Sequence, residues 1–213
     1  MKTINYRPIQ KNDYPQIIEL LSAVWQFDKY INDTRTAKRA GESFWLSYIA
    51  RQNYAEVAER DGEILGLLLG HCAAVPFSPE HENQLVTAKN SLRQFMFSKE
   101  GRKFYKLQKR TAKYERQLLS THDGDFDSEL VLFATAPAAR GLGIGKALLR
   151  RFNAFLQEHG ALRAHLMTDS FCNVGFYDHL GYSKVGEKKV SLGAAQPSTP
   201  FYFYLYAYKV DEQ

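Results

Sequence analysis

The sequence predicts an α/β fold in which a mixed, mostly antiparallel sheet carries helices on both of its faces. Three observations support this fold class. Strand-like apolar runs alternate with amphipathic helical segments along the 213 residues. Residues 54–73 have the pattern of a hairpin around a turn at Asp61-Gly62. Residues 129–149 run from an apolar strand through a glycine-rich loop into a helix.

The first half of the chain predicts three strands and two helices. The first helix is expected to begin at Asp13, because Pro15 suits a first turn and Gln16 completes a capping-box pattern. Apolar residues at helical spacing follow as far as Trp25. The strands are expected over residues 3–9, 54–59 and 64–73, and the second helix over residues 34–50.

Residues 78–127 are long, polar and helix-prone, with aromatic residues interleaved among Lys and Arg. One interpretation is that they form amphipathic helices laid over the sheet. A second is that they form a lid or wall of a binding site, and a third is a surface for a partner or nucleic acid. The sequence leaves these alternatives open.

The second half begins with an apolar strand over residues 130–134, which Pro137 ends. Ile144, Leu148 and Phe152 then recur at helical spacing, which predicts a helix over residues 143–159. The remaining elements are expected to be a strand over 163–168, a short helix over 173–180, and strands over 183–192 and 201–210, joined by a loop over 193–200.

The loop before the helix at 143–159 is typical of an anion site. Gly141, Gly143 and Gly145 leave backbone N–H groups accessible at a helix start, and Arg140 and Lys146 add positive charge. It is not an ATPase P-loop, because Arg140 stands where the first glycine is required and no hydroxyl residue follows Lys146. The glycine spacing also differs from the dinucleotide fingerprint.

The spacing of Arg140, Gly143 and Gly145 resembles the acyl-CoA pyrophosphate loop of the GCN5-related N-acetyltransferases, the GNAT family. Residues 173–182, NVGFYDHLGY, resemble the second signature of that family, a short helix ending in Phe-Tyr and followed by Gly and an aromatic residue. The resemblance implies a GNAT-like sheet within a single acyl-CoA N-acyltransferase domain over residues 1–213. Residues 78–127 would then be an atypical helical insertion between the third and fourth strands.

The resemblance also implies a reaction, in which an acetyl group moves from acetyl-CoA to a primary amine by direct attack in a ternary complex, without a metal. The backbone of the loop would hold the pyrophosphate, and the unpaired edge of the fourth strand would pair with the pantetheine arm. Asn173 would contact the same arm, although a helix N-cap is an alternative role for it. The implied cofactor-binding residues are Phe133, Ala134, Thr135, Arg140, Gly141, Leu142, Gly143, Ile144, Gly145, Lys146 and Asn173.

Two residues are the candidate acid and base. Tyr177 matches the tyrosine that protonates the departing thiolate in the family, although its ring could instead only pack beside its neighbours. Glu129 matches a glutamate that takes the amine proton, often through water, and a solvated carboxylate is the alternative interpretation. Asp127, His122 and Asp169 are further candidates for the base.

An acyl-enzyme intermediate is not expected from the sequence. Cys172 lies close to the expected position of the sulfur, but no histidine is placed beside it in the sequence to generate a thiolate. Cys72 lies within a predicted strand and is expected in the core.

The expected partner is a small-molecule or peptide amine acceptor, and the sequence leaves a polyamine, an aminoglycoside, an amino acid, a peptide N-terminus and a protein lysine open. The acceptor is expected to approach from the side built by the first two helices and the last two strands. There, Trp25, Phe27 and Tyr30, together with the tyrosines of the last strand such as Tyr204, suggest an aromatic pocket. The tyrosines at alternate positions of that strand could equally cover a half-buried sheet face or form a homodimer contact.

Composition limits the other functions. The net charge of +5 suits an anionic ligand, and without a zinc finger or RNA-recognition motif no specific nucleic acid is expected. No apolar run predicts a membrane span, and the first ten residues lack the apolar centre of a signal peptide. Two cysteines are too few for a disulfide framework, so a cytoplasmic location is expected. A non-catalytic CoA-binding sensor or interaction module is the alternative function.

Overall fold

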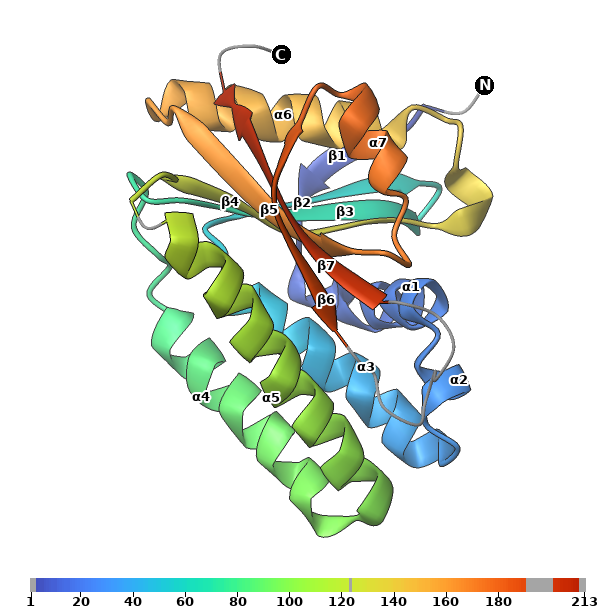
Figure 1. Ribbon diagram of the computed structural model, residues 1–213. Coiled ribbons are helices and arrows are strands. Elements are labelled where there is room, and N and C mark those ends of the chain that lie inside the picture. The colour runs from blue at the N-terminus through green and yellow to red at the C-terminus, as the bar shows by residue number, and fades with distance from the viewer. Residues whose placement is uncertain (1–2, 123, 191–200, 211–213) are drawn as a thin grey trace.

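The seven strands form one sheet in the order β1-β2-β3-β4-β5-β7-β6. The computed structural model describes residues 3–122, 124–190 and 201–210, and only the backbone of Tyr30. Neighbouring strands are antiparallel except for β4 and β5, which are parallel. The predicted fold class, a mixed and mostly antiparallel sheet flanked by helices, is confirmed (Figure 1).

The elements follow the predicted order along the chain. The strands are β1 (Asn5–Pro8), β2 (Tyr54–Arg60), β3 (Glu63–Cys72), β4 (Ser128–Thr135), β5 (Arg163–Asp169), β6 (Ser183–Val190) and β7 (Phe201–Lys209). The helices are α1 (Tyr14–Trp25), α2 (Phe27–Tyr30), α3 (Thr34–Ile49), α4 (His81–Arg93), α5 (Lys99–Leu119), α6 (Ile144–Glu158) and α7 (Val174–His179). The predicted loop at 193–200 lies outside the described residues.

The predicted capping box at the start of α1 is wrong. The Asp13 side chain makes no capping bond to α1; it accepts hydrogen bonds from the Arg7 guanidinium at 2.7 and 2.9 Å and from the Gln10 N–H at 2.7 Å. Gln16 reaches across to the β2–β3 turn, where it bonds to the Gly62 carbonyl and the Ile64 N–H. A salt bridge to β1 therefore outcompetes the local cap.

The helices form two layers around the sheet. α6 and α7 cover one face, and α1, α3, α4 and α5 lie on the other (Figure 1). Leu67, Leu68 and Leu69 on β3 are all fully buried, with Leu67 and Leu69 in one core cluster and Leu68 in the other. A strand covered on both faces needs apolar residues at every position, which explains its continuous apolar run.

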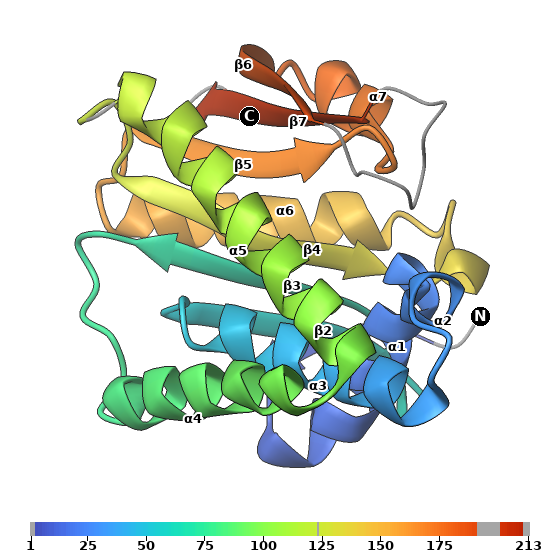
Figure 2. The same ribbon diagram turned by 60° about the horizontal axis from the view of Figure 1, so that its bottom comes forward.

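The insertion at residues 78–127 contains α4 and α5. α4 packs along α3, and α5 crosses beneath the strands from the α2–α3 region to the far side of the sheet (Figure 2). Ser98 caps α5 by accepting the Gly101 N–H at 2.9 Å. Phe104 near the start of α5 packs against Phe95 and Phe27, and Leu118 near its end packs beside Leu205 of β7.

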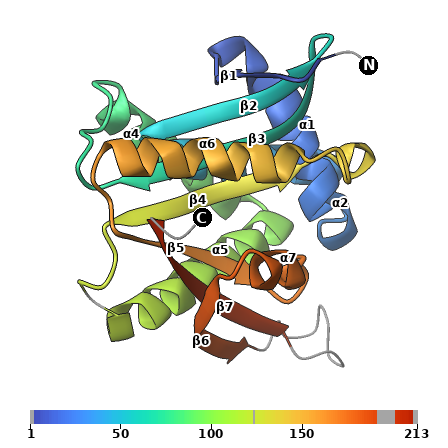
Figure 3. The ribbon, with the colours of Figure 1, turned by 90° about the horizontal axis from the view of Figure 1, so that it is seen from above.

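β4 and β5 separate from one another after a short paired stretch. Their pairing covers Ser128–Ala164, Glu129–His165 and Leu130–Leu166. Beyond Leu130 the two strands diverge, and α7 lies beside the far end of β5 (Figure 3). A shift in register between β3 and β4, from Leu69–Leu132 to Gly70–Leu130, falls at the same level. The sheet is therefore opened at its centre.

Candidate functional site

The loop between β4 and α6 has an exposed backbone. Gly141 and Gly143 adopt left-handed φ angles of +82° and +75°, and a Cβ added at either position would meet no atom within 4 Å. These positions need glycine for their backbone conformation, not because the protein itself fills the space. Arg140, Leu142 and Lys146 are exposed around them.

The start of α6 presents hydrogen-bond donors without acceptors. Within the described backbone, the first bond at this end runs from the Ala147 N–H to the Gly143 carbonyl at 3.0 Å. The N–H groups of Ile144, Gly145 and Lys146 therefore lack a backbone acceptor, and Gly143 provides no side-chain cap. With the two nearby cations, this helix start can hold a phosphate group.

Gly145 has a different role from the other glycines of the loop. A Cβ at this position would lie 3.1 Å from the ring of Phe133 on β4 and 3.5 Å from the ring of Phe176 on α7. These two rings stack on each other with their centroids 5.8 Å apart. Gly145 therefore allows β4, α6 and α7 to pack closely at the open end of the sheet.

The free edge of β4 runs through the residues expected to contact the acyl arm. Phe133, Ala134 and Thr135 pair with β3 on one side, and no β5 residue pairs with them on the other. Backbone groups of a strand point alternately to its two sides, so part of this segment faces the opening. Such an edge can pair with an extended amide-containing ligand.

Tyr177 lies on α7 at this opening. It is buried, and its ring lies within 6 Å of the rings of Phe176, Tyr182 and Tyr206. Burial raises the pKa of Tyr177 well above its ordinary value, and Cys172 nearby raises it further. The phenol therefore keeps its proton at neutral pH, as a proton donor must.

The structure also places Asn173 and Cys172. Asn173 is the exposed N-cap residue of α7, but its side chain makes no capping hydrogen bond, so the alternative structural role is not observed. Desolvation of the sulfur raises the pKa of Cys172, and the Asp169 carboxylate raises it further, although the residue as a whole is exposed. A raised pKa disfavours the thiolate that an acyl-enzyme route would need.

Glu129 is a paired carboxylate rather than a solvated one. Its Oε1 accepts a hydrogen bond from Nη2 of Arg51 at 2.5 Å, and its side chain is 19% exposed. In the sheet register His71 lies opposite it on β3 and His165 on β5. Directly opposed residues share one face of a sheet, so the three side chains lie side by side on the face that α3 and α5 cover.

His165 has a buried nitrogen without a partner. Its Nδ1 donates to the Ser128 carbonyl oxygen at 3.0 Å, so Nδ1 carries the proton of the neutral ring. The other ring nitrogen, Nε2, therefore has a lone pair and is an acceptor. His165 is 9% exposed, and its Nε2 has no hydrogen-bond partner within the described part of the chain. Burial lowers the pKa of His165, so the ring is neutral at neutral pH.

Three more side chains, those of Tyr48, Glu115 and Asp169, complete a polar cluster with Arg51, Glu129, His71 and His165. The Tyr48 ring lies 5.6 Å from the Arg51 guanidinium. Burial raises the pKa of Tyr48 well above its ordinary value, and Glu115, Glu129 and Asp169 raise it further. Within the described residues, no group of three or more His, Cys, Asp or Glu side chains is arranged to hold a metal ion.

The other candidate bases have structural roles. Asp127 accepts the N–H groups of Leu162 and Arg163 at 2.8 and 3.3 Å, which fixes the turn before β5. The His122 ring stacks on Phe126 and its Nδ1 bonds to the neighbouring Thr121 hydroxyl. Asp169 alone lies near both Tyr48 and Tyr177.

The expected aromatic pocket is not assembled. Trp25 and Phe27 pack on Phe44 in the core between the sheet and α1 and α3. Tyr204 packs in the cluster on the opposite, α6 face. The side chain of Tyr30 lies outside the described part of the structure. Side chains of a strand alternate between its two faces, so the tyrosines at alternate positions of β7 lie on the face away from the polar cluster.

The sequence did not predict a role for Arg51, Glu115, Tyr48, His71 or His165. A signal for Glu115 existed, because it follows Phe104 by eleven residues, or about three helical turns, and so falls on the buried stripe of α5. No sequence pattern marks Arg51, which lies just beyond α3.

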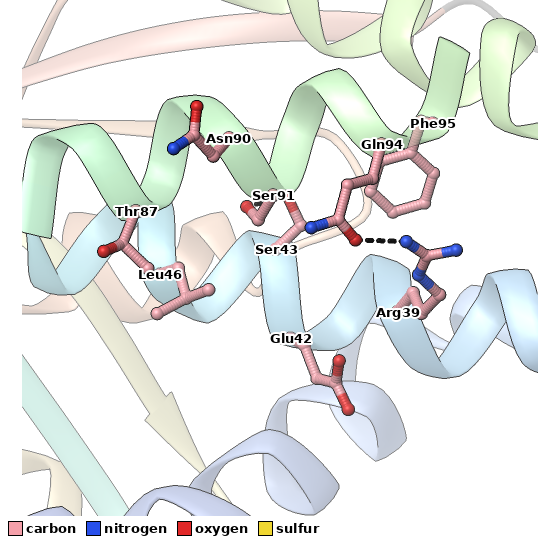
Figure 4. A pocket seen from close by; sticks show the side chains of 9 residues that line it. All are labelled: Arg39, Glu42, Ser43, Leu46, Thr87, Asn90, Ser91, Gln94 and Phe95. Atoms are coloured by element: carbon pink, nitrogen blue, oxygen red, sulfur yellow. Dashed lines mark hydrogen bonds between the residues drawn. The ribbon is translucent and has the colours of Figure 1, made fainter. Parts of the chain in front are cut away.

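A groove between α3 and α4 lies apart from these residues. It has a volume of about 290 Å³, and Arg39 donates a hydrogen bond to Gln94 across it (Figure 4). Its lining contains none of the candidate catalytic or cofactor-binding residues. It is lined by Arg39, Glu42, Ser43, Leu46, Thr87, Asn90, Ser91, Gln94 and Phe95.

Comparisons with known proteins agree with this geometry. Residues 112–184 match the family model described as "Acetyltransferase (GNAT) domain". The chain is similar in structure to arylalkylamine N-acetyltransferase 2 from Aedes aegypti, with a TM-score of 0.60 and 14% identity over 98% of this chain and 100% of that one. It is also similar to a polyamine N-acetyltransferase from Drosophila melanogaster, with a TM-score of 0.55 and 12% identity over 97% of this chain and 100% of that one. A third similar structure is an N-acetyltransferase from Staphylococcus aureus, with a TM-score of 0.55 and 13% identity over 98% of this chain and 99% of that one.

The described structure combines a central sheet that opens between β4 and β5 with an uncapped start of α6. Residues 112–184 match the model of the GNAT acetyltransferase domain, and the chain as a whole shares the fold of solved N-acetyltransferases. The structural matches are all below 25% identity, so they establish the shared fold. Among the described residues, no helix is both long and apolar enough to cross a bilayer.

Proposed function

We propose that this chain is an N-acetyltransferase, a single domain over residues 1–213 that transfers an acetyl group from acetyl-CoA to a primary amine by direct attack. The observation that carries the proposal is the divergence of β4 and β5 beyond Leu130, directly beside the uncapped start of α6. A diphosphate at the helix start and an extended arm in the opening would be held by neighbouring parts of one site.

The loop residues hold the diphosphate. Backbone N–H groups of Gly141 and of residues 143–146 donate to its oxygens, and Arg140 and Lys146 supply charge. The open space at Gly141 and Gly143 and the missing backbone acceptors at the helix start fit this ligand. The edge of β4 at Phe133, Ala134 and Thr135, with Asn173 on the other side, directs the arm into the sheet.

Acetyl transfer forms a bond from the amine nitrogen to the carbonyl carbon and breaks the carbon–sulfur bond. A β4 N–H donates to the carbonyl oxygen, which stabilises the negative charge that develops there. Glu129 accepts the proton that the amine loses, directly or through water, and Tyr177 donates a proton to the departing sulfur. No covalent bond to the protein is needed, because the acyl donor is already activated.

The proposal is tested by calorimetry with acetyl-CoA and by thiol release over a panel of primary amines. Binding together with amine-dependent thiol release supports it. Binding without release for any amine would support the alternative of a CoA-binding module. An absence of binding would overturn both. A cytoplasmic location of the protein and its assembly into a homodimer remain predictions from the sequence.

A further inference from the structure

The stripe of α5 that faces the sheet changes character along its length. Phe104 and Leu118 are buried at its two ends. Between them, at helical spacing, lie Gln108, Thr111 and Glu115, all of which are half-buried. A helix that only covers a sheet would keep this stripe apolar throughout. The polar centre therefore faces something other than the hydrophobic core.

The polar centre of α5 faces the cluster around Glu129. α5 crosses beneath β4 and β5 (Figure 2). Glu115 lies close enough to raise the pKa of both Arg51 and Tyr48, and Glu129 in turn raises the pKa of Glu115. Arg51 is anchored on this face by its hydrogen bond to Glu129 at 2.5 Å and by the Tyr48 ring at 5.6 Å.

The cluster carries more negative than positive charge. Within the described part of the chain, Glu115, Glu129 and Asp169 raise the pKa of Tyr48 and Arg51 lowers it. His71 and His165 add no charge, because burial lowers the pKa of both rings. Burial also raises the pKa of Glu115 and Asp169, as expected where cations are too few to offset desolvation.

A second observation points to a ligand at the same place. His165 is nine-tenths buried, its Nε2 is an acceptor without a donor, and its ring lies beside Glu129 in the register. A buried acceptor without a donor is uncommon because desolvation is costly. A ligand with N–H groups would supply the missing donor and, if cationic, the missing charge.

We propose that α5 and the end of α3 complete a pocket for a small amine that carries a second positive charge, and that Glu115 binds this second charge. The proposal rests on the proposed acetyl transfer, since the pocket is the acceptor side of that site. Glu129 and His165 face the amine that reacts, while Glu115, on the helix across from them, binds the far ammonium group. The insertion then determines acceptor choice.

The test compares two acceptors with the same four-carbon chain, 1,4-diaminobutane and 1-butylamine, of which only the first carries a second ammonium group. We expect kcat/KM to be at least about tenfold higher for the diamine. Glu115→Gln should reduce this ratio to about one. Glu100→Gln, which removes the same charge from the exposed start of α5, should leave the ratio unchanged. Equal rates for both amines, or equal effects of the two substitutions, would overturn the proposal.

A binding measurement separates this proposal from the proposed reaction. Calorimetry with 1,4-diaminobutane in the presence of free CoA requires no catalysis. Diamine binding that Glu115→Gln weakens about tenfold or more, with no thiol release in the assay, would leave the pocket in place and refute the acetyl transfer. Acetyl transfer to amines without any preference for the diamine, and without Glu115-dependent binding, would refute the pocket alone.

Discussion

Arg51 Nη2 and Glu129 Oε1 form a 2.5 Å hydrogen-bonded ion pair that joins the end of α3 to the start of β4. The pair occupies one oxygen of the carboxylate. It also fixes the direction of the other oxygen on the face where α5 crosses the sheet. A carboxylate held in this way can accept a proton at a defined position, whereas a mobile surface carboxylate cannot.

The first prediction concerns Glu129 as the proton acceptor. Glu129→Gln keeps the shape of the side chain and removes its basicity, so kcat should fall by about 100-fold or more. The KM for acetyl-CoA should change little, because the loop that holds the cofactor is untouched. Glu187→Gln removes a similar charge from an exposed pair on β6 and serves as the control. Equal activity of the two variants would exclude Glu129 as the base.

The second prediction concerns Tyr177 as the proton donor. Tyr177→Phe keeps the buried ring but removes the hydroxyl, so kcat should fall by about 100-fold while calorimetry shows unchanged acetyl-CoA affinity. Tyr206→Phe removes a hydroxyl from the same aromatic cluster, where that hydroxyl donates to Asp178 at 2.9 Å, and should keep most of the activity. Full activity of Tyr177→Phe would show that another group protonates the sulfur.

The third prediction separates backbone strain from ligand binding. Gly143→Val forces a β-branched residue into a left-handed conformation, at a cost of about 1–2 kcal/mol in stability, and places a side chain where the diphosphate would lie. Acetyl-CoA affinity should fall by more than about tenfold. Gly62→Val imposes the same strain at φ +82° in the β2–β3 turn and should lower Tm without weakening acetyl-CoA binding. Similar affinities would refute the role of the loop.

The sequence predicted the fold well, because the strands, the helices and the glycine-rich turn before α6 depend on local patterns. Apolar periodicity marked the strands and helices, and the glycines between Arg140 and Lys146 marked the loop. The capping box failed because Arg7, on a neighbouring strand, competes for Asp13. The sequence predicted Gly145 only as part of the loop. In the structure it also allows close packing against Phe133 of β4 and Phe176 of α7, which are distant in the sequence.

The polar cluster could not be predicted, because tertiary contacts create it. Arg51, Glu115 and His165 lie on three segments separated by more than 45 residues each, and none belongs to a recognisable motif. Only the fold places them on one face of the sheet. The insertion shows the same limit: its amphipathic pattern predicted helices, but the point at which α5 crosses the sheet depends on packing at both of its ends.

The fourth prediction tests the packing of α6 on the centre of the sheet. A Cβ at Gly70 on β3 would lie 2.1 Å from Cε2 of Phe152, so Gly70→Ala should destabilise the fold by about 1–3 kcal/mol. Phe152→Leu removes ring atoms and should partly relieve the clash. Denaturant unfolding of both single variants and the double variant should therefore show favourable coupling. Strict additivity would mean that β3 moves away from the ring.

The fifth prediction concerns the pH dependence of stability at Glu115. Burial raises the pKa of Glu115 in the folded chain above its unfolded value; Arg51 partly opposes this shift and Glu129 adds to it. The folded state therefore binds this proton more tightly. Stability from that proton is present below the unfolded pKa of about 4.3 and is lost as pH rises through the folded pKa.

Glu115→Gln should consequently stabilise the chain at neutral pH, because it removes a charge that the folded state disfavours. A change of about 1 kcal/mol corresponds to roughly 2–4 °C in Tm for a chain of this size. The difference in Tm between the variant and the parent should shrink as pH falls from the raised folded pKa of Glu115 to the unfolded pKa of Glu. Glu100→Gln, at an exposed pair, should show no such gain. A loss of stability in Glu115→Gln at pH 7 would mean that the ion pairing of Glu115 with Arg51 outweighs its burial, and the charge excess assigned to the cluster would be wrong.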